Sequence, residues 1–415
     1  MIRFIMCQKI ALQFPARNYV SLFHKRMLNN LHFARFVLTT LILIVILGVL
    51  TACAQSGPPA PAAPATAEAP IEAVQEEAPE EEPLPDGVFS PGLDYNTLQL
   101  PALDWDGLEN GIHDHAGRLV FIDRPVERLI SGFYISTSAI IALGLEDKLV
   151  GIEARADMRP IYALAAPQLL DLPNVGTARD FNMEAALALE PDLVVLPIRL
   201  RDAAEIMEEL GVPVILVEPE CPDKLIEMFT MISAAMGVRD RTISLIQSYE
   251  RSLKEVAELT EGITDRPVVY MGGVGTYLST SPSGMYQSSL IELAGGINAA
   301  GDIEGTSRIE VSYEQLLAIN PDVIIIPPEA AYTKEDILNN PQLVYLSAVQ
   351  NGRIYHMPSS FEAWDSPVTS FPLGIRWLLS VLHEDVYPFE DMKEYAAAFH
   401  LEFFGVEIDT DLITR

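Results

Sequence analysis

The sequence is short of cysteine, histidine and positive charge. It has 3 cysteines and 7 histidines in 415 residues, and 27 Lys and Arg against 58 Asp and Glu give a formal net charge of −31. No basic face is available to neutralise phosphates, so a nucleic-acid partner is excluded. Cys7 and Cys53 lie near the N-terminus and Cys221 stands alone, so the remaining chain has no disulfide framework.

The motifs of several enzyme classes are also missing. Segment 280–284, TSPSG, lacks the leading glycine of a nucleophile elbow, and neither a P-loop nor a G-x-G-x-x-G after a strand occurs. No histidine falls in a loop that we expect to line a cleft, which argues against a site for free Zn²⁺ or Mn²⁺. His113 and His115 precede the first strand, where they would catch only a stray metal. We therefore expect a protein that is not an enzyme and has neither a metal site nor an intrinsic cofactor.

An apolar run near the N-terminus is typical of a secretory signal peptide. Residues 36–50, FVLTTLILIVILGVL, follow Lys25, Arg26 and Arg35 and are too few to span a bilayer comfortably. The ending LTAC at 50–53 resembles the bacterial lipobox, in which the cysteine is lipidated and becomes the new N-terminus. We predict a lipoprotein signal peptide over 1–52, starting at Met1 or Met27, and a lipid anchor on Cys53.

Proline, alanine and glutamate dominate the segment that follows. Residues 55–87 contain no lysine or arginine, and such a composition cannot bury a core. We predict a disordered tether over 53–110. Anchor and tether together place the rest of the chain outside the cytoplasm, lipid-anchored to the outer face of the cell membrane or on its periplasmic side.

From about Gly111 the pattern changes to strand-length apolar runs separated by helical segments. Runs such as VVLP and VIIIP are continuously apolar, which is typical of strands covered on both faces. Strands of this kind alternating with helices predict parallel α/β sheets.

The globular part contains an internal repeat. Residues 183–197, MEAALALEPDLVVLP, correspond to 313–327, YEQLLAINPDVIIIP, and Glu, Pro, Asp and Pro match at one offset of 130. This spacing is too long for a solenoid and predicts two related lobes, over 111–237 and 263–415. Residues 238–262 carry apolar side chains at helical spacing, so we expect one helix to join the lobes. Packing of that helix within a single lobe is the alternative.

Four further segments carry a family resemblance. They are NVGTARDFNMEAALALEPDLVVLP, MYQSSLIELAGGINAA, VSYEQLLAINPDVIIIPP and AVQNGRIYHMPSSFEAWDSP, in this order. Over roughly 119–406 the chain resembles the helical-backbone (class III) periplasmic binding proteins of ABC importers for iron–siderophore, haem and cobalamin. The resemblance implies an α/β fold of two doubly wound lobes with parallel sheets, one long linking helix, and a ligand cleft between the lobes. It also implies a monomer that works with an ABC permease and its ATPase.

The resemblance also implies two docking residues. In the family, one glutamate on each lobe contacts basic pockets of the permease, and by motif these are Glu184 and Glu314. A protein with two related lobes that meets a twofold permease should present the same charge twice. The alternative is two solvated acids placed favourably at helix N-termini.

Arginines and aromatic residues gather where the predicted strands end. Because ligands of open α/β sheets bind beyond the carboxyl ends of strands, we predict a ligand site there. Its candidate residues are Tyr134, Arg155, Arg159, Arg179, Asp180, Arg199, Tyr277, Tyr286, Arg308, Phe361 and Trp364. Arginine forks bind anionic oxygens and aromatic side chains cover flat or apolar groups, which together favour a negatively charged metal chelate.

A ferric siderophore is our first prediction for the ligand. Corrinoid, haem, and molybdate or tungstate are alternatives, as is a ligand-sensing lipoprotein that signals to a membrane receptor.

Overall fold

The computed structural model describes residues 111–415, which lie in one compact unit. The predicted signal peptide, the lipidated Cys53 and the tether lie outside the described residues. None of the helices in the described part has both the length and the apolar character needed to cross a membrane.

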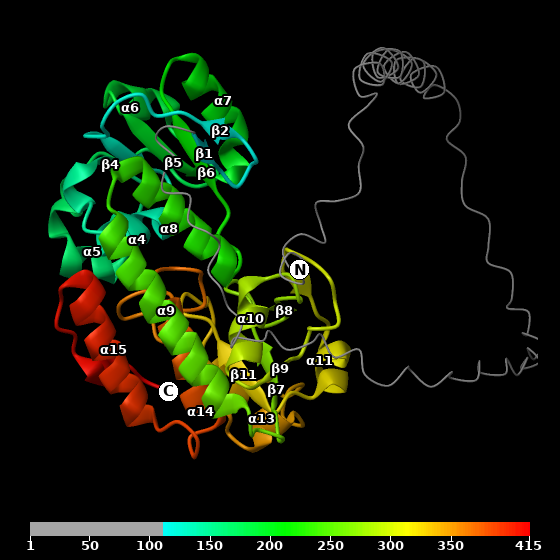
Figure 1. Cartoon of the computed structure of the whole chain (residues 1–415). Coiled ribbons are helices and arrows are strands. Elements are labelled where there is room, and N and C mark those ends of the chain that lie inside the picture. Colours follow the sequence, from blue (N-terminus) through cyan, green and yellow to red (C-terminus); the bar gives the residue numbers. More distant parts are fainter. Residues whose placement is uncertain (1–110) are drawn as a thin grey trace, which may run out of the picture. The chain divides into compact units, whose positions relative to one another are not determined.

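The first lobe is built on a four-stranded parallel sheet in the order β4-β3-β5-β6 (Figure 1). Its strands are β3 (Leu129–Ser131), β4 (Leu149–Ile152), β5 (Leu193–Pro197) and β6 (Val214–Val217). Every residue of β5 and β6 is buried, because helices cover both faces of the sheet. A short antiparallel hairpin, β1 (Ile112–His113) with β2 (Leu119–Val120), attaches beside β6 through a hydrogen bond from the His115 amide to the Leu216 carbonyl.

The second lobe repeats this plan. Its parallel sheet has the order β12-β11-β7-β9, made of β7 (Val268–Met271), β9 (Ile297–Asn298), β11 (Val323–Ile326) and β12 (Ile354–His356). Numbered along each half, both sheets follow the order second, first, third, fourth. A two-stranded antiparallel ribbon, β8 (Ser279–Thr280) with β10 (Ile309–Glu310), extends the second lobe.

The sequence repeat corresponds to equivalent pieces of the two lobes. The first copy contains α6 (Met183–Ala188) and β5, and the second contains α11 (Tyr313–Ile319) and β11. After each helix one residue takes a left-handed backbone, Glu190 with φ 47° and Asn320 with φ 46°. The aspartate of each Pro-Asp pair then accepts backbone N–H groups where the neighbouring first strand begins: Asp192 from Arg128, and Asp322 from Val268. These two aspartates fix the start of each sheet's first strand.

One helix, α9 (Arg239–Thr260), carries the chain from the first lobe to the second (Figure 1). It packs against α8 (Pro222–Met236) of the first lobe and α14 (Phe371–Leu382) of the second. The Tyr249 ring on α9 contacts Phe229 on one side and Phe371 on the other, with ring centroids 5.9 and 4.7 Å apart. The joining helix is therefore part of a continuous apolar core. The expected fold, α/β with two parallel-sheet lobes and one linking helix, is confirmed.

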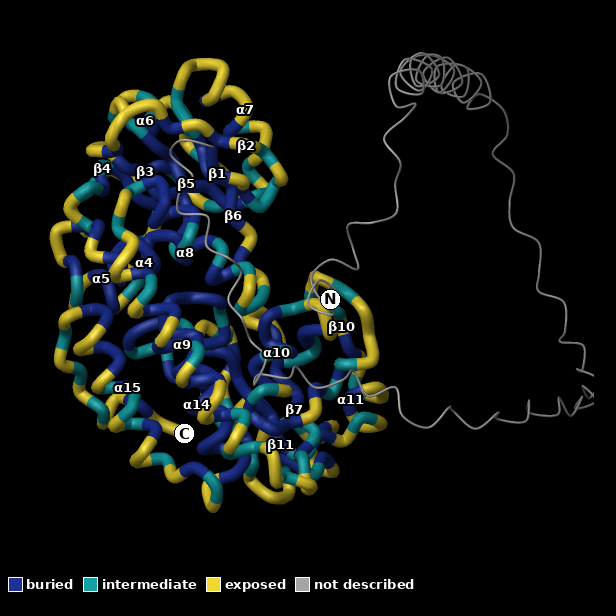
Figure 2. Tube along the Cα trace, viewed as in Figure 1, coloured by how far each residue is buried: buried dark blue, intermediate teal, exposed yellow. Residues whose placement is uncertain are grey.

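The remaining helices cover the sheets and the junction between the lobes. Figure 2 shows the strands and the inner helix faces buried and the outer turns exposed. The first-lobe helices are α4 (Tyr134–Ala142), α5 (Pro160–Ala165) and α7 (Arg201–Glu209). The second-lobe helices are α10 (Tyr286–Leu293), α12 (Lys334–Leu338), α13 (Ser347–Gln350) and α15 (Phe389–Phe404). Helix α15 packs against both α14 and α4, so the C-terminal part of the chain returns to the first lobe.

Candidate ligand-binding cleft

A cavity of about 320 Å³ lies at the carboxyl ends of the first-lobe strands and is bounded on its other side by residues of the second lobe. Strand order reverses between β3 and β5, and this switch point is where open α/β sheets bind ligands. The residues that line the cavity are Phe133, Tyr134, Ile135, Thr177, Ala178, Arg179, Arg199, Glu220, Gln287, Ser366 and Pro367.

Arg179 reaches the cavity from a tight turn between β4 and α6. The Thr177 amide donates to the Asp180 carbonyl at 2.8 Å, which closes the turn. Gly176, which precedes it, has φ +91°, and a Cβ there would lie 2.3 Å from the Asp180 carbonyl oxygen. Glycine is thus required for the turn that presents Arg179.

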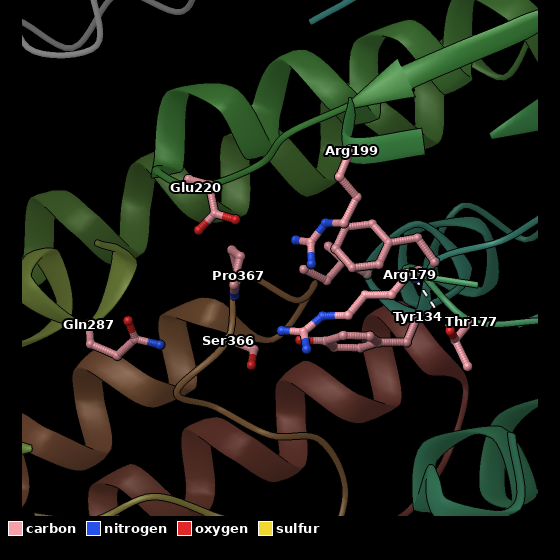
Figure 3. Close-up of a pocket in the computed structure, with 11 residues that line it drawn as sticks. Tyr134, Thr177, Arg179, Arg199, Glu220, Gln287, Ser366 and Pro367 are labelled. Atoms are coloured by element: carbon pink, nitrogen blue, oxygen red, sulfur yellow. Dashed lines mark hydrogen bonds between the residues drawn. The ribbon is translucent and has the colours of Figure 1, made fainter. Parts of the chain in front are cut away.

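Arg199 follows β5 directly, on a short 3-10 turn over Ile198–Leu200. Its guanidinium and that of Arg179 point into the same space, toward the second-lobe loop that carries Ser366 and Pro367 (Figure 3). Both arginines are exposed, and neither forms an ion pair with a carboxylate of residues 111–415. The cavity therefore offers two positive charges, with their donors, to an incoming anion.

Tyr134 lines both this cavity and a second one. Burial raises the pKa of its phenol to about 12, although a hydrogen bond with the Ser366 side chain acts in the other direction. The Arg159 guanidinium stacks over its ring, 4.2 Å from the centroid. At neutral pH the Tyr134 hydroxyl keeps its proton and serves as a hydrogen-bonding group rather than as an anionic metal ligand.

The second cavity, of about 190 Å³, is lined by Tyr134, Arg159, Glu329, Phe361 and Glu362 among others. Beside this second cavity, two hydroxyl groups of α4 donate hydrogen bonds to buried carboxyl groups. Thr137 donates to Glu153 of the first lobe at 2.7 Å, and Ser138 donates to Glu362 of the second at 2.5 Å. Burial raises the pKa of both carboxyls. The first of these contacts lies within the first lobe, and the second joins the two lobes.

The predicted site residues fall into three groups. Tyr134, Arg179 and Arg199 line the first cavity, and Arg159 and Phe361 line the second. The other six lie outside both cavities: Arg155, Asp180, Tyr277, Tyr286, Arg308 and Trp364.

Each of these six has a local reason for its position. Tyr286 and Trp364 are core side chains, at 1% and 0% exposure. Arg308 donates to the Gly272 carbonyl at the end of β7, and the Tyr277 hydroxyl pairs with that of Tyr313. Arg155 and Asp180 are exposed residues of turns beside the cavity.

The cavity residues that were missed from the sequence include Glu220, Gln287 and Ser366. Glu220 follows β6, so the strand-end rule that selected Arg199 after β5 would also have selected it. Gln287 adjoins the predicted Tyr286, and Ser366 lies two residues from the predicted Trp364. Nothing in the sequence showed which of these side chains face the cavity.

The two predicted docking glutamates are exposed and occupy equivalent places. Glu184 lies in the first turn of α6, and Glu314 lies in the first turn of α11. Hydrogen bonds from the helix backbone and from Ser312 lower the pKa of Glu314, so it stays ionised.

Comparison with known proteins decides the family. Residues 129–361 match the family model described as periplasmic binding protein. The chain belongs to the periplasmic binding protein family. The molybdate-binding protein MolA of Haemophilus influenzae is 23% identical over 346 residues, covering 76% of this chain and 97% of that protein. The Fe(3+)-citrate-binding protein YfmC of Bacillus subtilis is 25% identical over 249 residues, covering 59% and 76%.

Solved structures share the fold. A periplasmic solute-binding protein from Veillonella parvula superposes with a TM-score of 0.65 at 21% identity, covering 72% of this chain and 94% of that one. Molybdate-bound MolA of Haemophilus influenzae also gives 0.65 at 21% identity, covering 72% and 98%. The chain is thus a solute-binding protein of the ABC-transporter type, from an exported family.

Proposed function

We propose that this protein captures a compact, negatively charged iron chelate and delivers it to an ABC permease. The observation that carries the proposal is the pair Arg179 and Arg199, which form no ion pair with a carboxylate of residues 111–415 and point into one cavity. In a chain with a net charge of −31, two such arginines at the sheet's switch point favour an anionic ligand.

The size and chemistry of the cavity narrow the choice of chelate. About 320 Å³ is near the lower end of the ~300–1,000 Å³ typical of ligand pockets, which disfavours a corrinoid. Haem would need an axial ligand, but no histidine lines the cavity and burial raises the pKa of Tyr134 to about 12. A ferric chelate held through its outer oxygens by Tyr134, Arg179 and Arg199 fits these groups best.

The proposed delivery uses the rest of the chain. Lipid on Cys53 would hold the protein at the membrane, and the tether over 53–110 would let the binding unit move beside it. Glu184 and Glu314, exposed at equivalent places on the two lobes, would dock onto the permease. ATP hydrolysis by the partner ATPase would then drive transfer.

Calorimetric titration of the purified protein with ferric citrate and with ferric hydroxamate and catecholate chelates tests the proposal. We expect one of them to bind, and Arg179→Ala or Arg199→Ala to weaken that binding at least about tenfold, because each removes a charge-assisted contact. Arg251→Ala is the matched control, since it removes one exposed charge from α9, away from the cavity. Unchanged affinity in both cavity variants would contradict the proposal.

Molybdate is the second candidate. A cavity near the small end of the ligand-pocket range, with two arginine forks, also suits a tetrahedral oxyanion, and the chain is similar to MolA over most of its length. Tight molybdate binding by the unaltered protein, with no response to any iron chelate, would replace the first candidate with this one.

A further inference from the structure

The cavity that holds the two arginines also holds an acid. Glu220 lines it together with Arg179 and Arg199, and the carboxylate points toward the same space as the two guanidinium groups (Figure 3). Glu220 forms no ion pair with either arginine in the described part of the chain. One wall of the cavity is thus positive, and a separate point on its rim is negative.

The backbone that carries Glu220 is held in place. The segment follows β6, the strand beside β5, so Glu220 and Arg199 stand at the ends of adjacent strands. The Glu218 amide donates to His115 Nδ1 at 2.6 Å, the Glu220 amide donates to the Glu218 carbonyl at 2.9 Å, and Pro219 is buried. The backbone of Glu220 therefore has a defined place at the edge of the cavity.

An acid in this place acts differently on different anions. Loss of solvent and the nearby Glu218 raise the pKa of Glu220, while Arg199 lowers it. A bare tetrahedral oxyanion offers only acceptor oxygens, so it attracts the arginines but repels Glu220, and a repulsion of this kind discriminates between ligands. An anion that also carries a hydrogen-bond donor can bind the two arginines through its oxygens and donate to Glu220 at the same time.

We propose that Glu220 selects ligands that carry a hydrogen-bond donor beside their anionic oxygens and rejects simple oxyanions. The donor is a hydroxyl, an amide or ammonium N–H, or a metal-bound water. This inference rests on the proposed binding of an anion by Arg179 and Arg199, and it adds a chemical requirement to the ligand. It favours a hydroxycarboxylate or hydrated metal chelate over molybdate.

Titration of sodium molybdate into the unaltered protein, Glu220→Gln and Glu209→Gln tests the selection. Glu220→Gln keeps the shape of the side chain and removes its charge, so we expect its molybdate affinity to rise about tenfold or more. Glu209→Gln removes an exposed charge at the end of α7 that does not line the cavity, and its molybdate affinity should stay near that of the unaltered protein.

The outcomes separate this inference from the proposed function. Equal molybdate affinity in Glu220→Gln and the unaltered protein, or tight binding by the unaltered protein, overturns the selection by Glu220. A gain in Glu220→Gln alone supports it, even if no iron chelate binds and the proposed cargo is wrong. If an iron chelate does bind, Glu220→Gln should weaken it while it strengthens molybdate, and strengthening of both would also overturn the inference.

Discussion

Arg159 and Glu329 form an ion pair between the two lobes, with Nη1 and Oε1 2.7 Å apart. Arg159 immediately precedes α5, and Glu329 lies in the loop after β11. The Arg159 side chain is 25% exposed and that of Glu329 is 49% exposed, so solvent screens the attraction. The pair orients Arg159 over Tyr134 more than it stabilises the fold.

The first prediction concerns this pair. Glu329→Gln should cost at most ~1 kcal/mol in the free energy of unfolding. Arg159→Met should cost more, because it also removes the stacking on Tyr134, worth ~0.5–1 kcal/mol. Urea unfolding of both variants and of the double variant gives the coupling energy, which we expect at ~0.2–1 kcal/mol. A coupling well above this range would mean that the pair locks the lobes together.

The second prediction concerns Asp365, a buried acid at the junction of the lobes. Burial raises the pKa of its carboxyl from 3.8 to about 6, with Arg308 opposing the shift. Between those two pH values the folded state binds the proton better than the unfolded state, so this carboxyl's stabilising contribution is lost as pH rises from about 4 to about 6. Asp365→Asn cannot ionise, so its stability relative to the unaltered protein should rise by up to about 3 kcal/mol across that window.

Urea unfolding at a series of pH values from 4.5 to 8 measures this difference in the free energy of unfolding. Asp385→Asn, at an exposed position, is the control for loss of one charge. A stability difference between Asp365→Asn and the unaltered protein that does not change with pH would show that Asp365 has no raised pKa.

The third prediction concerns the paired aspartates that fix the first strands. Asp192→Ala leaves the Glu127 and Arg128 amides without their acceptor, and Asp322→Ala does the same to the Val268 amide. Each should lower the free energy of unfolding by ~1–3 kcal/mol. The asparagine variants keep an acceptor oxygen and should lose less. Thermal midpoints that fall equally for alanine and asparagine would mean that charge, rather than the hydrogen bonds, matters.

The fourth prediction concerns docking. The double variant Glu184→Ala, Glu314→Ala should bind ligand normally but lose most of the transport measured in cells or vesicles that hold the cognate permease. Both side chains are exposed and outside the cavities, so stability and affinity should not change. Glu335→Ala, an exposed acid on α12, controls for the change in charge. Full transport by the double variant would rule out these two contacts.

Much of the fold could be predicted because its causes are local. Buried strands such as β5 require continuous apolar runs, and the repeat at an offset of 130 shows in the letters themselves. The partners of Asp192 and Asp322 could not be predicted. They accept hydrogen bonds from amides 64 and 54 residues away, and only the folded sheet brings those residues together.

The site was harder to predict because position along the chain does not set the direction of a side chain. Trp364 and Ser366 are two residues apart in one loop, yet Trp364 is fully buried and Ser366 lines the cavity. Arg179 and Arg199 were found because strand ends in an α/β sheet lead to one edge. Glu220 stands at the same edge, after β6, and was not among the predicted residues.

Because the chain passes between the lobes through α9, the protein could be cut into two fragments after this helix. Within residues 111–415, every strand pair lies wholly before or wholly after that helix. A break in the backbone near Gly262 would leave each sheet with all of its strands. The two fragments would still have complementary surfaces, through Ser138 with Glu362 and Tyr249 with Phe371, on which to reassemble without a peptide link.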